Sequence, residues 1–182
     1  MQLTTERLIL REYIADDWAA VLAYHSDSRY QRFYAQADHT PEQARDFVQM
    51  FLDHQVEQPR LKFQLALTLK STGQLIGGCG IRRRTPNAHE ADIGYELNPA
   101  YWGQGYASEA ARAMVAFGFN ELRLHRIWSW CIADNVGSAR VLEKLGMRRE
   151  GHLRENEFFK GRWWDTLMFA ILEQEWQSQQ QP

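Results

Sequence analysis

The chain has 182 residues, of which 45% are hydrophobic and 13% aromatic, and its 21 basic and 23 acidic side chains leave a formal net charge of −2. A chain of this length buries one substantial core, so we expect a single domain over residues 1–182 rather than two. The near balance of charge excludes a global attraction to nucleic acid or anionic membranes, so any anion site must be local.

Neither the N-terminus nor the cysteines indicate export or metal binding. The opening residues MQLTTERLILREY contain no basic stretch followed by a long apolar core, and no apolar run approaches the roughly 20 residues of a membrane helix. Cys79 and Cys131 lie in expected strands, without a CxxC pair or a histidine cluster at metal-ligand spacing. We expect a cytoplasmic protein with reduced thiols, no metal and a frayed polar tail at residues 177–182.

The first half of the chain alternates strand and helix patterns. RLILREY predicts a strand, and ADDWAAVLAY has apolar side chains at helical spacing. A second helix is predicted over residues 40–55, where Thr40, Pro41 and Gln43 form a capping-box pattern. KFQLALTL and QLIGGCGI flank a turn at residues 71–73 and are followed by EADIGYEL, which predicts three consecutive antiparallel strands.

The second half predicts one strand-helix-strand crossover followed by a hairpin. Apolar residues at helical spacing over 107–121 precede RIWSWCIA, a buried strand. Asn135 is a helix cap for VGSARVLEKL, and Gly146 is placed to end that helix in a left-handed turn. LRENEFFKGRWWDTLMFAIL predicts two long strands joined near residues 160–161. The sum is a mixed α/β sheet domain of about seven strands and about four helices.

Two glycines stand between a strand end and a helix start in NPAYWGQGYASEAA, residues 98–111. The backbone N–H groups of about residues 103–107 precede the first intrahelical acceptors and form a local site for phosphate. Gly103 and Gly105 present no side chain to an approaching ligand and accept unusual dihedral angles. For an isolated GxG, a tight strand-to-helix turn is the simpler interpretation.

A dinucleotide-binding fold is a further interpretation of this stretch. Gly103 and Gly105 match the start of GxGxxG, and Asp134 closes the next strand, where a ribose-binding acid would stand. Ser108 replaces the third glycine, and three antiparallel strands precede the single crossover. Both features disfavour a nucleotide-dependent oxidoreductase.

Three motifs, in this order and spacing, resemble the GNAT acetyltransferase superfamily and within it the RimJ/RimL-like N-acetyltransferases: YWGQGYASEA, ADNVGSARVLEKLGM and GRWWDTLMFAI. The resemblance extends from TTERLILRE to EQEW. It implies a GNAT-like three-layer fold with a mostly antiparallel sheet, in which a parallel pair of strands splays apart and acetyl-CoA threads the gap. The superfamily loop Q/R-x-x-G-x-G/A would then hold the pyrophosphate on Trp102, Gly103, Gln104, Gly105, Tyr106 and Ala107, with Trp102 where Gln or Arg is usual.

Acetyl transfer from a thioester to an amine needs a neutral amine, stabilisation of the oxyanion and a proton for the departing thiolate. Glu157, in RENEFF, matches the position that resembles the RimL-like catalytic glutamate. Glu96 ends the strand before the glycine loop, where other GNAT enzymes carry their base. We place Glu157 ahead of Glu96, although either can be a solvent-facing strand residue.

Ser138 is the candidate acid. It lies one helical turn after Asn135 and shares a face with Leu142 and Leu145, so we expect it to point inward. Many GNAT enzymes have a tyrosine acid at the position of Leu142, whereas Ser138 matches the serine of the RimL-like branch. Asn135 and Ser138 are also expected at the cofactor site, although both can serve only as helix caps.

Arg140 and Lys144, on the same helix, are candidates for the nucleotide phosphates of acetyl-CoA, and a solvated basic face explains them equally well. The resemblance implies an N-acetyltransferase that acts on a primary amine, either a protein N-terminus, notably a ribosomal one, or a small molecule. A non-catalytic acyl-CoA-binding or sensor module is the alternative. We expect no nucleic-acid or membrane partner, and a monomer or homodimer.

Overall fold

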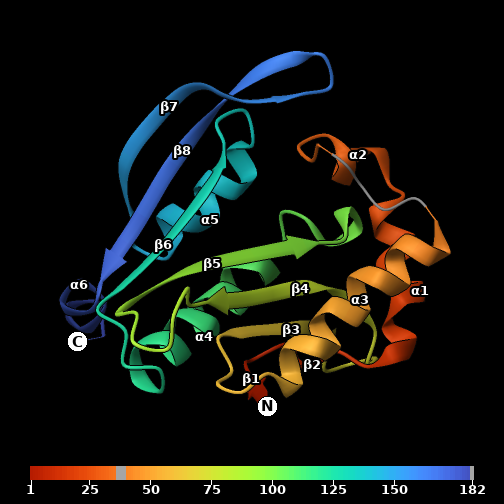
Figure 1. The fold of residues 1–182 in the computed structure, drawn as a ribbon, viewed down its shortest axis with the longest axis horizontal. Helices are drawn as coiled ribbons and strands as arrows, with labels where there is room; N and C mark the ends of the chain where they lie inside the picture. Colours follow the sequence, from red (N-terminus) through yellow and green to blue (C-terminus); the bar gives the residue numbers. More distant parts are fainter. Residues whose placement is uncertain (36–39, 181–182) are drawn as a thin grey trace.

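The structure, a computed structural model, describes residues 1–35 and 40–180, and its strands form a single eight-stranded sheet (Figure 1). The strand order is β1-β2-β3-β4-β5-β6-β8-β7, and the described neighbours are antiparallel except for the parallel pair β5–β6. The strands are β1 (Gln2–Thr4), β2 (Leu8–Glu12), β3 (Lys62–Leu69), β4 (Leu75–Arg82), β5 (Glu90–Leu97), β6 (Arg126–Ile132), β7 (Arg148–Phe159) and β8 (Arg162–Leu172).

Helices cover both faces of the sheet, which gives the three-layer mixed α/β fold expected from the sequence (Figure 1). One face carries α1 (Trp18–His25) and α3 (Pro41–Val56), with the short α2 (Ser28–Gln31) beside them. The other face carries α4 (Tyr106–Asn120) and α5 (Val136–Lys144). The 3-10 helices η1 (Ala15–Asp17) and η2 (Pro99–Tyr101) precede α1 and the glycine loop, and α6 (Glu173–Ser178) follows β8.

The structure adds one strand and two α-helices to the predicted elements. These are β1, α2 and α6, of three, four and six residues, which are too short for hydrophobic periodicity to reveal. Helix α6 includes residues 177 and 178, the start of the tail that we expected to fray, and residues 181–182 lie outside the described part.

The helix cap and the turn glycines predicted from the sequence are present in the structure. Thr40 Oγ1 accepts the Gln43 N–H at 3.2 Å while Gln43 Oε1 accepts the Thr40 N–H at 3.1 Å, so the capping box starts α3. Gly73, in the β3–β4 turn, and Gly146, after α5, have φ of 72° and 79°, which favour glycine. These signals are local in the chain, so the sequence alone could specify them.

Two apolar layers separate the helices from the sheet. The layer under α4 and α5 includes Met114 and Leu142, and the layer under α1 and α3 includes Val21 and Val48. The β7–β8 hairpin extends beyond this body and arches over the end of the sheet toward α2 (Figure 1). A single parallel pair in an otherwise antiparallel sheet excludes the doubly wound sheet that a dinucleotide fold needs.

Candidate active site

The parallel strands β5 and β6 separate part of the way along their length. They pair in register at Glu90–Arg126, Ala91–Ile127 and Asp92–Trp128, yet β5 continues to Leu97 and β6 to Ile132. At the point of separation the Ser129 hydroxyl donates to the Ile93 carbonyl at 2.8 Å. We call the region where the two strands no longer pair, residues 93–97 and 129–132, the slot. It is the splayed pair that the resemblance implied.

The glycine loop, residues 102–107, follows β5 and η2 and includes the first two residues of α4, Tyr106 and Ala107. Gly103 and Gly105 have φ of 75° and 84°, and Gly105 is the N-cap of α4. The first hydrogen bond of α4 runs from the Glu109 N–H to the Gly105 carbonyl at 3.0 Å. The N–H groups of residues 106–108 therefore precede every intrahelical acceptor and remain available to a ligand.

The surroundings of this loop fit a phosphate group. A Cβ added at Gly103 would meet no atom within 4 Å, so the backbone there faces open space. Trp102 is 45% exposed and its indole N–H donates to the Leu97 carbonyl at 2.8 Å, which fixes the start of the loop to the end of β5. Its side chain lies at the rim of the loop, where the superfamily motif has Gln or Arg.

Helix α5 brings the candidate acid to the slot. The Asn135 side chain accepts the Ser138 N–H at 3.2 Å, so Asn135 caps α5 as predicted. Ser138 is half-buried, and its Oγ lies 3.0 Å from the Tyr95 hydroxyl. The Tyr95 hydroxyl also donates to the Ser138 backbone carbonyl at 2.9 Å. Tyr95 of β5 therefore holds Ser138 of α5 in place beside the slot.

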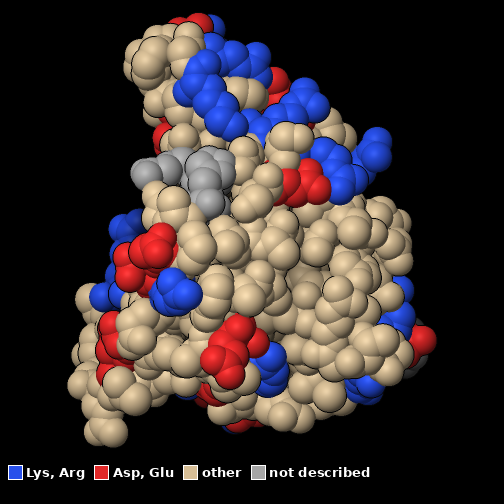
Figure 2. Space-filling model, turned by 90° about the vertical axis from the view of Figure 1, so that its right-hand side faces the viewer, with Lys and Arg blue, Asp and Glu red and all other residues tan. Residues whose placement is uncertain are grey.

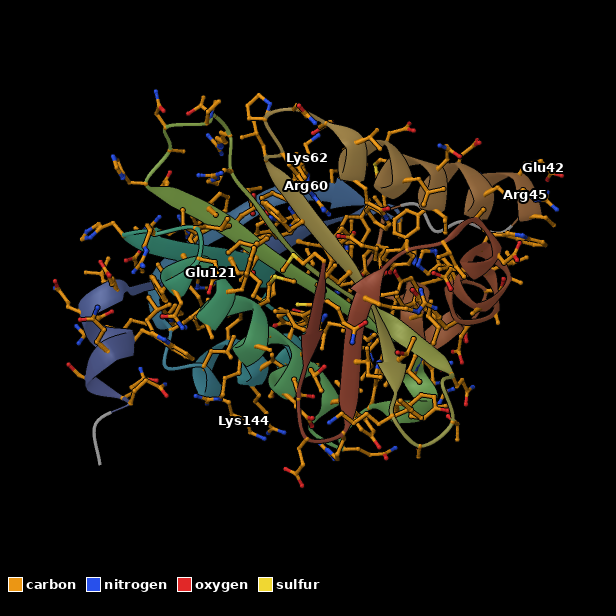
Figure 3. The ribbon with its side chains drawn as sticks, turned by 90° about the horizontal axis from the view of Figure 1, so that it is seen from below. Glu42, Arg45, Arg60, Lys62, Glu121 and Lys144 are labelled. Carbon is orange, nitrogen blue, oxygen red and sulfur yellow. The ribbon has the colours of Figure 1, made fainter. Side chains whose placement is uncertain are left out.

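The two basic candidates on α5 are exposed. Arg140 lies mid-helix, and Lys144 is the last helical residue (Figure 3). The Lys144 backbone carbonyl accepts a hydrogen bond from Arg112 of α4 at 2.7 Å. Arg112 follows the start of α4 by six residues, about 9 Å of helix, so Lys144 is set back from the glycine loop.

Glu96 lies near the end of β5 with only 11% of its side chain exposed. Its carboxylate accepts the Tyr24 hydroxyl at 2.7 Å and the Tyr30 hydroxyl at 2.5 Å, and His25 Nε2 lies 3.3 Å away. Burial raises the pKa of the Glu96 carboxyl, but the hydrogen bonds and charge of this cluster outweigh burial and hold the pKa below its usual value. Burial and the Glu96 charge raise the pKa of both phenols, which stay protonated as donors.

Glu157 lies on β7, directly opposite Trp164 of β8, and is half-buried. Thr166 of β8 pairs with Ile132, the last residue of β6. Trp164 precedes Thr166 by two residues, so it lies past the end of β6. The Trp164 ring stacks on Phe159 at 4.9 Å. Residues opposite one another in an antiparallel pair share a face. Glu157 therefore lies beyond the open end of the slot, on the Trp164 face.

The slot has different chemistry on its two sides. Tyr95 and Glu96 are consecutive on β5, so their side chains point to opposite faces of the sheet. Tyr95 reaches Ser138 of α5, and Glu96 reaches Tyr24 and Tyr30 on the α1 and α2 side. The Ser138 hydroxyl, a group able to give a proton to a leaving group, thus lies on one face of the sheet, and the Glu96 carboxylate with its two phenol donors lies on the other.

The sequence named Ser138, Glu96 and Glu157 as candidates but did not predict the hydrogen bonds that hold the first two. Tyr95 contacts Ser138 from 43 residues away in the chain, and Tyr24 and Tyr30 contact Glu96 from 72 and 66 residues away. The alternation of EADIGYEL was the one available signal, because it places Tyr95 and Glu96 on opposite faces.

Within residues 1–35 and 40–180, no three His, Cys, Asp or Glu side chains gather as metal ligands. No helix in those ranges has the length and apolarity to cross a membrane.

Residues 7–148 match the family model described as an acetyltransferase (GNAT) domain. The chain is 38% identical to the uncharacterized N-acetyltransferase YnaD of Bacillus subtilis, over 97% of this chain and 99% of YnaD. A solved GNAT-family acetyltransferase from Bacillus anthracis superposes with a TM-score of 0.84 at 36% identity, covering 96% of this chain and 99% of that one. The ribosomal-protein-S5-alanine acetyltransferase of Vibrio fischeri shares the fold, with a TM-score of 0.82 at 22% identity over 97% of this chain and 98% of that one.

Proposed function

The chain belongs to the GNAT family of N-acetyltransferases, and from this premise we propose that it transfers the acetyl group of acetyl-CoA to a primary amine by direct attack in a ternary complex. The observation that carries the proposal is the slot. Strands β5 and β6 part beside the free N–H groups that start α4, Ser138 lies beside the opening, and Glu157 lies beyond its open end.

The glycine loop is the proposed pyrophosphate site. Residues 103–107 supply mainly backbone N–H groups, and the helix dipole adds positive potential at the start of α4. Trp102, Gln104 and Tyr106 border this site, Asn135 and Ser138 line the slot, and Arg140 and Lys144 are proposed for the more distant phosphates of the nucleotide. Bound acetyl-CoA supplies the activated acetyl group, and the chain supplies orientation and proton transfer.

We assign the general base to Glu157 ahead of Glu96. The Glu96 carboxylate is already occupied by two phenol donors, and its lowered pKa weakens it as a proton acceptor. Glu157 is half-buried beyond the open end of the slot, and we propose that the amine approaches from that end. In this proposal Glu96 organises Tyr24 and Tyr30 as one wall of the acceptor site.

Ser138 is the proposed proton donor to the departing thiolate, held in place by Tyr95. A covalent acetyl-cysteine route is disfavoured by the state of the thiols. Both cysteines are buried, and burial raises the pKa of Cys79 to about 12 and of Cys131 to about 11. Neither is a thiolate near neutral pH, which supports direct attack by the amine.

As the acceptor we propose a protein N-terminus, as in the RimJ/RimL-like enzymes, in preference to a polycationic small amine. Figure 2 shows Lys and Arg side chains gathered at the hairpin end of the face that carries α1 to α3. Arg154 of β7 and Lys160 of the β7–β8 turn are exposed, and Arg162 of β8 is exposed and paired with Asp134 at 2.7 Å. Positive charge at this end of the molecule disfavours a polycation. We also propose a cytoplasmic location, where acetyl-CoA and reduced thiols coexist.

The test is CoA release from acetyl-CoA with a panel of acceptors that includes a peptide with an N-terminal alanine and a set of small primary amines. Acceptor-dependent release supports the proposal. Acetyl-CoA binding in calorimetry without release for any amine would favour the non-catalytic acyl-CoA module. Binding of NAD but not of acetyl-CoA or CoA would contradict the assignment of the slot.

A further inference from the structure

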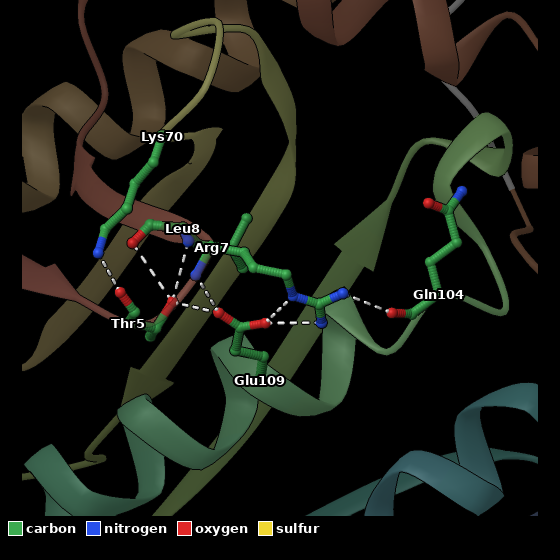
Figure 4. Close-up of polar contacts among 6 residues, drawn as sticks. All are labelled: Thr5, Arg7, Leu8, Lys70, Gln104 and Glu109. Carbon is green, nitrogen blue, oxygen red and sulfur yellow. Dashed lines mark hydrogen bonds and ion pairs between the residues drawn. The ribbon is translucent and has the colours of Figure 1, made fainter.

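Arg7 joins the N-terminal segment to the glycine loop (Figure 4). Its Nη1 donates to the Gln104 carbonyl at 3.0 Å, and its Nε and Nη2 both lie 2.7 Å from Oε2 of Glu109. The guanidinium also lies 4.3 Å from the centroid of the Tyr106 ring. One side chain thus contacts the loop backbone, the first residue of α4 and its first turn.

Glu109 is itself held from the other side. Its Oε1 accepts the Thr5 hydroxyl at 2.6 Å and the Arg7 backbone N–H at 2.8 Å. Burial raises the pKa of the Glu109 carboxyl, but the hydrogen bonds from Thr5 and Arg7 and the Arg7 charge outweigh it, so the pKa lies below its usual value. The carboxylate is therefore charged and gives the guanidinium a fixed anchor on α4.

The Gln104 carbonyl lies between the two glycines with positive φ. In a trans peptide the carbonyl of one residue and the N–H of the next point in opposite directions. When Arg7 binds the Gln104 carbonyl, it therefore turns the Gly105 N–H away from the guanidinium. This peptide joins Gln104 to Gly105, and Gly105 tolerates a wide range of φ, so the hydrogen bond from Arg7 to the Gln104 carbonyl fixes the direction of the peptide.

We propose that Arg7 is a positioning residue that aims the backbone N–H of the glycine loop at the pyrophosphate of acetyl-CoA. The inference rests on the proposed function of that loop. Arg7 acts through the Gln104–Gly105 peptide, so its loss affects recognition of the pyrophosphate and leaves the chemistry at the slot in place.

The Arg60–Glu12 pair provides a matched control. Arg60 binds both Glu12 oxygens at 2.8 and 3.0 Å and lies 4.7 Å from the Phe63 ring centroid, the same combination of contacts that Arg7 makes. Arg60 lies beside α3, on the opposite side of the sheet from Lys144 and α5 (Figure 3). A variant of Arg60 therefore reports what the loss of such a pair does to the fold alone.

The experiment compares two acetyl donors. Acetyl-CoA carries the pyrophosphate, and S-acetylpantetheine lacks both the pyrophosphate and the nucleotide. We expect Arg7→Gln to weaken acetyl-CoA binding about tenfold in calorimetry, the effect of one lost charged hydrogen bond. Turnover of S-acetylpantetheine should stay within about twofold of wild type, since no pyrophosphate contact is at stake. Arg60→Gln should leave both donors unaffected, even with an equal fall in Tm.

Arg7→Lys keeps the charge but not the planar fork that spans Glu109 and Gln104, so it should also weaken acetyl-CoA binding. Wild-type affinity in Arg7→Lys would overturn positioning in favour of simple charge. If Arg7→Gln binds acetyl-CoA as tightly as the wild-type protein does, or loses equally with both donors, the inference is overturned. The proposed function would still stand, provided that the wild-type protein binds acetyl-CoA. A wild-type protein that does not bind acetyl-CoA would overturn both.

Discussion

The bond between Tyr95 and Ser138 gives the sharpest quantitative prediction. Tyr95→Phe removes the hydroxyl that contacts both the carbonyl and the Oγ of Ser138, at 2.9 and 3.0 Å. Leaving half-buried partners without this group should cost about 2 kcal/mol of unfolding free energy. For a domain of this size, that is a fall of about 4 to 8 °C in Tm.

The effect on turnover separates positioning from stability. If Ser138 delivers the proton, Ser138→Ala should lower kcat about 100-fold, and Tyr95→Phe should lower it about tenfold by misplacing the hydroxyl. Because Tyr95 acts through Ser138, the double variant should have the kcat of Ser138→Ala alone.

The assay is steady-state CoA release at saturating acetyl-CoA, at a temperature where calorimetry shows every variant folded. The reasoning fails if Tyr95→Phe lowers kcat by the same factor in both backgrounds. It also fails if Ser138→Ala lowers Tm but keeps full turnover, since Ser138 would then serve only the helix start.

Three further predictions concern the loop, the carboxylates and pH. Gly103→Ala and Gly73→Ala both place a Cβ in open space at positive φ, so each should lose about 1–2 kcal/mol of stability, but only Gly103→Ala should weaken acetyl-CoA binding in calorimetry. Glu157→Gln should lower kcat about 100-fold or more and leave the affinity for acetyl-CoA unchanged. Glu96→Gln should mainly lower Tm. A fall in kcat for Glu96→Gln alone would reverse the base assignment. The pKa values of Glu96 and Glu109 are lowered in the folded state, so their stabilisation is present above the unfolded pKa of about 4.3 and is lost as pH falls through the folded values. Urea unfolding at a series of pH values between neutral and acid should show this loss of unfolding free energy. Glu109→Gln should make the unfolding free energy depend less steeply on pH.

The features that the sequence could predict are those whose cause is local in the chain. Asn135 caps α5 through a residue three positions away, and Gly146 needs only its own backbone angle. The contacts that complete the site join distant segments. Arg7 meets Glu109 across 102 residues, and Tyr24 meets Glu96 across 72. No periodicity or spacing encodes such pairs, because they depend on how the strands are ordered in the sheet.

The strand order also explains why so much of the site lies in a short stretch of chain. A parallel pair requires a crossover, so α4 must begin at the end of β5 where the two strands part. The free N–H groups of α4 therefore lie beside the slot. The alternation of β5 directs Tyr95 to α5 and Glu96 to α1 and α2. A shift of β5 by one residue would exchange these faces, placing the carboxylate against Ser138 and the phenol against the acceptor side. The positions of the Tyr95 phenol and the Glu96 carboxylate thus depend on the register of this one strand, which the pairing of Gly78 with Glu96 and of Cys79 with Tyr95 fixes.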